Sequence, residues 1–185
     1  MIIAVIVAVL ATVLGLLRGG SLRALSEVQV RALAVLYAGL ALQIGFDIWD
    51  PEWLGSEGGF AVLLGTNVLI ALFFWLNRGL PGALIAAVGF AMNVIVITAN
   101  GAMPVSRRAA EMAGMTEELP VGLKHEWMGQ DTVLPWMADV IPVPVLRSVV
   151  SVGDVVLAAG IAWFVYSSAT RTRPEASSST ETVSD

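Results

Sequence analysis

Two aspartates stand in apolar surroundings, where a carboxylate is costly. Asp154 lies within the apolar run 148–168, and Asp139 interrupts "DTVLPWMADVIPVPVL". A charge at the centre of a membrane helix costs roughly 2.5–3.5 kcal/mol on insertion scales, so such a residue usually faces protein or water and marks a candidate functional site. We therefore expect Asp154 to face a polar pocket, and Asp139 is a second carboxylate that needs an explanation.

His125 is the only histidine, and it stands in the sequence "KHEW". As a general base it needs a carboxylate partner, which Asp131 or Asp139 can supply. As a metal ligand it lacks the histidine or cysteine neighbours of a zinc site, and the chain has no cysteine. We expect neither a metal nor a cofactor, and a surface or capping role is the plainer interpretation of His125.

Five apolar runs predict the elements that hold these residues. The chain has 185 residues, 57% hydrophobic and 14% charged, with a mean hydropathy of +0.80, as in integral membrane proteins. Each run has 17 to 21 residues, about the length that a helix needs to cross the hydrocarbon core. The expected fold is an all-α membrane protein, one domain over 1–170, with transmembrane helices at 1–17, 32–49, 60–76, 83–99 and 148–168.

The basic residues predict the orientation of these helices. Loops 18–31 and 77–82 carry arginines, as does the start of the tail, whereas loop 50–59 carries three acidic residues and no base. The positive-inside rule then places the N-terminus outside and the C-terminus in the cytoplasm. Nine arginines against one lysine fit GC-rich bacterial coding, so we expect a bacterial plasma membrane. Residues 171–185 are expected to form a disordered cytoplasmic tail.

Polar side chains on four of the helices fall at related depths. With a rise of 1.5 Å per residue, Gln43, Asn67, Asn93 and Asp154 lie about 9–10 Å below the expected outer surface. Amides on neighbouring helices can thus reach Asp154, although their alternative role is simply to join helices. The expected polar pocket comprises Gln43, Asp47, Asn67, Asn93, Asn100, His125 and Asp154. Gly153 and Gly160, seven residues apart, are expected to form a close-packing seam beside it.

The outer loop 100–147 is too long and too apolar for a simple linker. A short helix capped by Ser106 is expected within "PVSRRAAEMAGM". The apolar run around Asp139 contains Pro135, Pro142 and Pro144, so it is too short and too proline-rich to span a membrane. We expect it to be an interfacial or re-entrant segment that lies over the helices.

Four motifs carry a resemblance to a known family. "NGAMPV", "KHEWM", "DTVLPWMADVIPVP" and "SVGDVVLAAG" resemble the domain of unknown function 5317 family of small bacterial membrane proteins. The resemblance extends to about Tyr166, and that family has no assigned activity. It implies a membrane protein in which Asn100, Pro104, His125, Asp139, Gly153 and Asp154 belong to a shared site.

A second resemblance concerns the two aspartates. Asp139 opens "DVI" and Asp154 closes "SVGD", which is similar to the two catalytic motifs of lipoprotein signal peptidases. This resemblance implies a pair of carboxyls sharing a proton, one activating water and the other polarising the scissile carbonyl. The chain departs from that pattern at Ser151 and Gly153, where the peptidases have asparagine and alanine, and in the shorter spacing.

Three functions follow from these features. The leading hypothesis is a non-catalytic accessory protein or subunit with an outer polar pocket, whose partners are the lipid bilayer and another membrane protein. The first alternative is an intramembrane aspartyl hydrolase with Asp139 and Asp154 as catalytic residues, and the second is a small transporter that titrates Asp154. The net charge of −5 without a basic stripe argues against nucleic-acid binding.

Overall fold

The described part of the chain is mostly helical, with five long helices and a smaller lobe of short strands. The computed structural model describes residues 2–49, 55–115 and 125–171. The long helices are α1 (Ile2–Leu17), α3 (Leu33–Trp49), α4 (Gly55–Leu76), α5 (Ala83–Asn100) and α7 (Val152–Ala169), and the short α2 (Leu22–Ser26) follows α1. Their positions match the five predicted apolar runs, except that α4 begins five residues before the predicted start and α7 begins four residues after it. The predicted tail, apart from its first residue, lies outside the described residues.

Three of the described helices are long and apolar enough to cross a membrane. They are the segments Glu57–Leu76 of α4, Ala83–Asn100 of α5 and Val152–Ala169 of α7. Two shorter apolar stretches lie in the other long helices, at Ile3–Leu17 and Leu33–Phe46. Length and composition thus support three membrane-spanning helices among the described residues, fewer than the five crossings that the sequence predicts.

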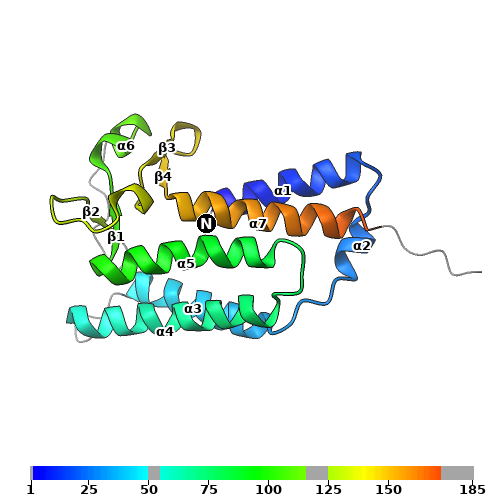
Figure 1. Cartoon of the computed structure of the whole chain (residues 1–185), viewed down its shortest axis with the longest axis horizontal. Helices are drawn as coiled ribbons and strands as arrows, with labels where there is room; N and C mark the ends of the chain where they lie inside the picture. The colour runs from blue at the N-terminus through cyan, green and yellow to red at the C-terminus, as the bar shows by residue number, and fades with distance from the viewer. Residues whose placement is uncertain (1, 50–54, 116–124, 172–185) are drawn as a thin grey trace, which may run out of the picture.

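The five long helices lie side by side in the order α1, α7, α5, α4, α3 (Figure 1). The helix α7, last in the sequence, is thus placed between the first and the fourth long helices. At its C-terminal end the backbone N–H of Ser21 donates to the carbonyl of Ala169 (2.9 Å), which ties the start of α2 to α7. The order of the long helices in space therefore differs from their order in the sequence.

A strand lobe, residues 101–115 and 125–151, sits at the end of the bundle where α5 ends and α7 begins (Figure 1). Its β1 (Met103–Val105) pairs in parallel with β2 (His125–Trp127), and its β3 (Ile141–Val143) pairs in antiparallel fashion with β4 (Ser148–Val150). The lobe also contains α6 (Arg107–Met112) and the 3-10 turns η2 (Pro135–Met137) and η3 (Pro144–Leu146). The predicted helix capped by Ser106 is confirmed, because Ser106 Oγ accepts from the N–H of Ala109 (3.3 Å).

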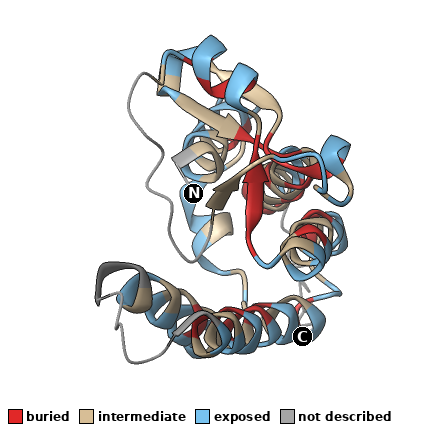
Figure 2. Ribbon diagram, turned by 90° about the vertical axis from the view of Figure 1, so that its left-hand side faces the viewer, coloured by how far each residue is buried: buried red, intermediate tan, exposed pale blue. Residues whose placement is uncertain are grey.

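The core of the strand lobe rests on α5. Val96 of α5 is fully buried and clusters with Met103, Met137 and Ala138 of the lobe. All three residues of β1 are buried (Figure 2). Apolar contact with α5 therefore holds the lobe on the helices, in the region where the sequence predicts an interfacial or re-entrant segment.

The predicted start of the last helix at Ser148 is wrong, and the reason is local. Residues 148–150 pair with β3, and Ser151 has the extended backbone (φ −87°, ψ 165°) of a helix N-cap. The helix therefore begins at Val152, and Asp154 is its third residue instead of lying six residues inside it. Apolar composition alone did not distinguish a lobe strand from the first turn of a membrane helix.

Candidate functional site

Asp154 is held in the first turn of α7 by a capping box. Its backbone N–H donates to Ser151 Oγ (2.9 Å), and its Oδ2 accepts from the backbone N–H of Ser151 (3.2 Å). This reciprocal pair satisfies two backbone donors that a helix start leaves without partners. A carboxylate near a helix N-terminus is also favoured by the helix dipole. Asp154 thus stabilises the N-terminus of α7.

Asn93 joins this helix start to α5. Its Nδ2 donates to Asp154 Oδ1 (2.8 Å), and its Oδ1 accepts from Ser151 Oγ (2.8 Å). Asn93, Ser151 and Asp154 therefore form a closed ring of hydrogen bonds. Both oxygens of the Asp154 carboxylate accept a bond within this ring. A Cβ at Gly153 would overlap Asn93 Oδ1 and would lie 2.7 Å from the backbone carbonyl oxygen of Gly89, so this position needs glycine.

Asp139 is buried in the strand lobe and is less fully bonded. Its backbone is anchored on both sides, because its N–H donates to the carbonyl of Pro104 (3.0 Å) and its carbonyl accepts from the N–H of Ser106 (2.9 Å). The residue is 6% exposed, and its Oδ1 has no hydrogen-bond partner among the described residues. An unpartnered buried carboxyl oxygen is costly, so this atom is a candidate contact for a ligand or a proton.

Asp139 has His125 as an ionisable neighbour, and it interacts electrostatically with Asp154 and with the N-terminal amino group. His125 Nε2 lies 3.8 Å from Asp139 Oδ2, a distance longer than a hydrogen bond. Burial first, and the negative charge of Asp154 second, raise the pKa of Asp139 from 3.8 to about 7. The carboxyl of Asp139 is therefore able to exchange a proton near neutral pH.

Asn100 acts as a clamp between α5 and the strand lobe. Its Nδ2 donates to the carbonyls of Val96 (2.8 Å) and Val133 (3.0 Å), and its Oδ1 accepts from the N–H of Val133 (2.8 Å). The Asn100 carboxamide thus pairs with both the N–H and the carbonyl of Val133. Its amide positions the segment that leads into η2.

Gln43 and Asn67 meet on the other side of the bundle, between α3 and α4. Gln43 Nε2 donates to Asn67 Oδ1 (3.0 Å) and to Thr66 Oγ1 (3.1 Å). Among the described residues, no hydrogen bond joins this pair to Asn93 or Asp154. Asp47 belongs to the same helix as Gln43, but its side chain lies outside the described residues. The residues predicted to form one pocket thus belong to several separate hydrogen-bonded contacts.

Three further polar residues have structural tasks that the sequence analysis missed. Ser151 stands three residues before Asp154 at the start of an apolar run, which is the spacing of a capping box and could have been recognised. Asn77 pairs with the backbone of Arg31, accepting from its N–H (2.8 Å) and donating to its carbonyl (2.9 Å). No pattern in the sequence indicates that contact, or the one between Thr66 and Gln43, because each partner is distant in the chain.

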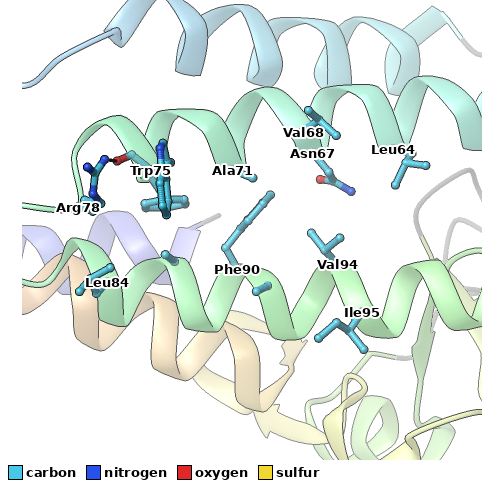
Figure 3. Close-up of a pocket in the computed structure, with 13 residues that line it drawn as sticks. Leu64, Asn67, Val68, Ala71, Trp75, Arg78, Leu84, Phe90, Val94 and Ile95 are labelled. Atoms are coloured by element: carbon cyan, nitrogen blue, oxygen red, sulfur yellow. Dashed lines mark hydrogen bonds between the residues drawn. The ribbon is translucent and has the colours of Figure 1, made fainter.

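An apolar groove runs between α4 and α5, with a volume of about 310 Å³ (Figure 3). Side chains such as Leu64, Ala71 and Phe90 line it, Asn67 contributes an amide, and Arg78 stands at one end. Among the described residues, no group of three His, Asp or Glu side chains is placed to hold a metal ion. The hydrogen-bonded ring at Asp154, the carboxyl of Asp139 and this groove are thus the features from which a function is built.

Comparison with known proteins identifies the family. The model of the family of unknown function DUF5317 matches residues 27–166. The chain belongs to this family. No curated protein and no solved structure matches it.

The family match includes every candidate site residue described above. It begins before α3 and ends within α7, so that the strand lobe, the ring at Asp154 and the groove all lie inside it. Both Asp139 and Asp154 are therefore part of what the family model describes.

Proposed function

We propose that this protein is a non-catalytic integral membrane protein of a bacterial plasma membrane, an accessory factor or subunit whose strand lobe lies on the outer side. The three apolar helices support a membrane location. The arginines of α2 and of the turn after α4 stand at the end of the bundle opposite the lobe, which by the positive-inside rule is the cytoplasmic end. This orientation has the N-terminus outside and the C-terminus inside, with all five long helices crossing.

The observation that carries the non-catalytic assignment is the bonding of Asp154. Its two oxygens accept from Asn93 Nδ2 and from the backbone N–H of Ser151. An aspartate that activates water, or that donates a proton to a substrate carbonyl, needs an oxygen directed at the substrate. Here the carboxylate instead joins α7 to α5 below the strand lobe. The partner expected for this lobe is another membrane protein.

One observation favours the alternative, an aspartyl hydrolase. The negative charge of Asp154 contributes to the raised pKa of Asp139, so the two carboxyls interact electrostatically. Coupled carboxyls with one shared proton are the basis of aspartic protease chemistry. Under this alternative, substrate binding would have to break the ring of hydrogen bonds around Asp154.

Asparagine substitutions distinguish the two functions. In the accessory assignment, Asp154→Asn places an NH₂ group or a weaker acceptor against the Ser151 N–H and costs about 1 kcal/mol of stability, as loss of a helix N-cap does. Thermal unfolding of the purified variant measures this loss. Asp139→Asn should leave the fold intact, because Asn matches the neutral carboxyl in size.

The same variants test for hydrolysis in cells. Membrane proteins from cells with the wild-type chain, Asp139→Asn or Asp154→Asn are compared for newly cleaved termini, with the variant protein levels matched. Identical sets of termini support the accessory assignment. Cleavage products that disappear in both variants, while the variants remain folded, would establish the hydrolase instead.

A further inference from the structure

The groove between α4 and α5 has the features of a lipid site. We propose that it holds one acyl chain of an anionic phospholipid, whose phosphate is bound by Arg78. This inference rests on the membrane location in the proposed function. The groove is lined by apolar side chains of both helices, and several of them, such as Leu64, Val68 and Ile95, are exposed on the outside of the molecule (Figure 3).

The size of the groove fits a hydrocarbon chain better than a protein helix. The lining on α4 extends from Leu64 to Trp75, a length of about 17 Å at 1.5 Å per residue. A volume of about 310 Å³ over that length gives a mean cross-section of about 19 Å². A helix is at least about 10 Å wide, or roughly 80 Å² in section. A partner helix could therefore rest on the groove but not enter it.

The depth of the groove matches one leaflet of a membrane. Asn67 lies nine residues before the end of α4, about 14 Å along the helix axis. Half of a hydrocarbon core of about 30 Å is close to this distance. An acyl chain that starts at the Arg78 end thus runs past Ala71 and Phe74 and reaches the level of Asn67 near the middle of the membrane.

Arg78 is fixed at the end of the groove in a position to bind an anion. Its Nη1 donates to the carbonyl of Trp75 (3.0 Å), and its guanidinium carbon lies 4.5 Å from the centre of the Trp75 ring. A guanidinium has five N–H donors, so most remain for a phosphate. No carboxylate among the described residues forms an ion pair with Arg78. The charge at this end of the groove is therefore complementary to an anionic headgroup.

Asn77 adds a second arginine to the same end. Its side-chain amide pairs with the backbone N–H and carbonyl of Arg31 at 2.8 and 2.9 Å. This contact holds the chain before α3 against the turn that carries Arg78. Each arginine near an anionic membrane surface favours binding by about 1 kcal/mol, which corresponds to about fivefold in affinity. The arginines at the turn after α4 thus give the selectivity for an anionic headgroup, and the apolar groove accommodates the acyl chain.

The test uses the full-length protein in detergent with palmitoyl-oleoyl-phosphatidylglycerol or the zwitterionic palmitoyl-oleoyl-phosphatidylcholine. Native mass spectrometry measures the lipid retained by each protein molecule. We expect one phosphatidylglycerol to be retained in preference, and Arg78→Gln to weaken it about fivefold. The matched control is Arg107→Gln, because Arg107 also stacks on a tryptophan, Trp127 at 4.4 Å, but lies in the strand lobe.

A second pair of variants tests the groove itself. Ala91→Phe fills the groove from α5, and Ala38→Phe adds the same bulk to an exposed position of α3 outside it. We expect only Ala91→Phe to abolish retention of phosphatidylglycerol. Equal retention of both lipids, equal loss in Arg78→Gln and Arg107→Gln, or crosslinks from the groove to a second copy of the chain would each overturn the inference. Release of the chain from membranes by alkaline carbonate would instead overturn the proposed membrane location.

Discussion

At the scale of single residues, the two aspartates have opposite environments. Asp154 has a partner for each oxygen, from Asn93 and from the Ser151 backbone, so its charge stabilises the start of α7. Asp139 is buried, and its Oδ1 has no partner among the described residues. Hydrogen bonds favour a carboxylate and burial disfavours it. The raised pKa of about 7 means that Asp139 is expected to change its protonation in the physiological range.

The stability of the protein should depend on pH through Asp139. Its pKa is about 7 in the folded protein and near 3.8 when unfolded, so between these values the folded state binds more protons. Stability from this group is complete below about pH 4, falls as the pH rises and is lost above about pH 7, a difference of about 4 kcal/mol at most. Thermal unfolding of the protein in detergent, at pH values from 5 to 8, measures this loss of stability.

The variant Asp139→Asn has no proton to lose and should show a smaller fall between pH 5 and pH 8. His125 and Asp154 are titratable groups near this carboxyl, and the N-terminal amino group also acts on it electrostatically. His125→Gln therefore serves as the control, and it should retain the fall. If the wild type and Asp139→Asn lose stability equally over this range, Asp139 is not the group responsible.

At the scale of elements, glycines bring α5 and α7 into backbone contact. A Cβ at Gly89 would lie 2.5 Å from the carbonyl oxygen of Gly153, and one at Gly160 would lie 2.3 Å from the N of Ala86. The predicted seam at Gly153 and Gly160 is confirmed, and its α5 half is the part that the sequence analysis missed. This close approach is what lets Asn93 reach across to Ser151 and Asp154.

Replacement of Gly89 by alanine should separate the two helices. Its added Cβ would lie 2.3 Å from the backbone N of Leu157, which cannot move alone. Overpacking of this kind costs typically 1–3 kcal/mol, and we expect a lower midpoint of thermal unfolding. Gly65 in α4 is the matched control, because nothing lies within 4 Å of its added Cβ. Gly65→Ala should stabilise the helix by roughly 0.5–1 kcal/mol. Equal effects of the two substitutions would contradict the seam.

At the scale of the whole molecule, the two ends of the bundle differ in character. The strand lobe and its buried carboxyl occupy one end, and α2 and the turn with Arg78 occupy the other. If the helices cross a membrane, these ends lie on opposite sides of it. The direction of insertion then decides whether Asp139 meets the outer medium or the cytoplasm.

Labelling of single cysteines should reveal that direction. The chain has no cysteine, so each introduced thiol is the only one. Gln130→Cys lies on the exposed surface of the strand lobe, and Ser26→Cys lies exposed at the end of α2. In intact spheroplasts, a membrane-impermeant maleimide should label Gln130→Cys at once and Ser26→Cys only after permeabilisation. The reverse pattern would place the lobe in the cytoplasm.

The sequence by itself determined which long segments are helical and where a long loop separates α5 from α7, whereas the short strands β1 to β4 in that loop were not predicted. Long apolar runs are a local property. The interfacial or re-entrant segment expected around Asp139 followed from its prolines, and the helix after Ser106 followed from its N-cap. Tertiary structure alone decided the partners of each polar residue. Asn93 pairs with Ser151 and Asp154, and Gln43 pairs with Asn67, because helices distant in the chain pack together.

The same reason explains the errors and the omissions. Residues 148–150 are apolar enough for a membrane helix, but their pairing with β3 makes them a strand and moves the helix start to Val152. The groove between α4 and α5 is formed by side chains of two helices and has no signature in either one. Local composition fixes the type of most elements, whereas contacts between distant segments fix their ends, their partners and the spaces between them.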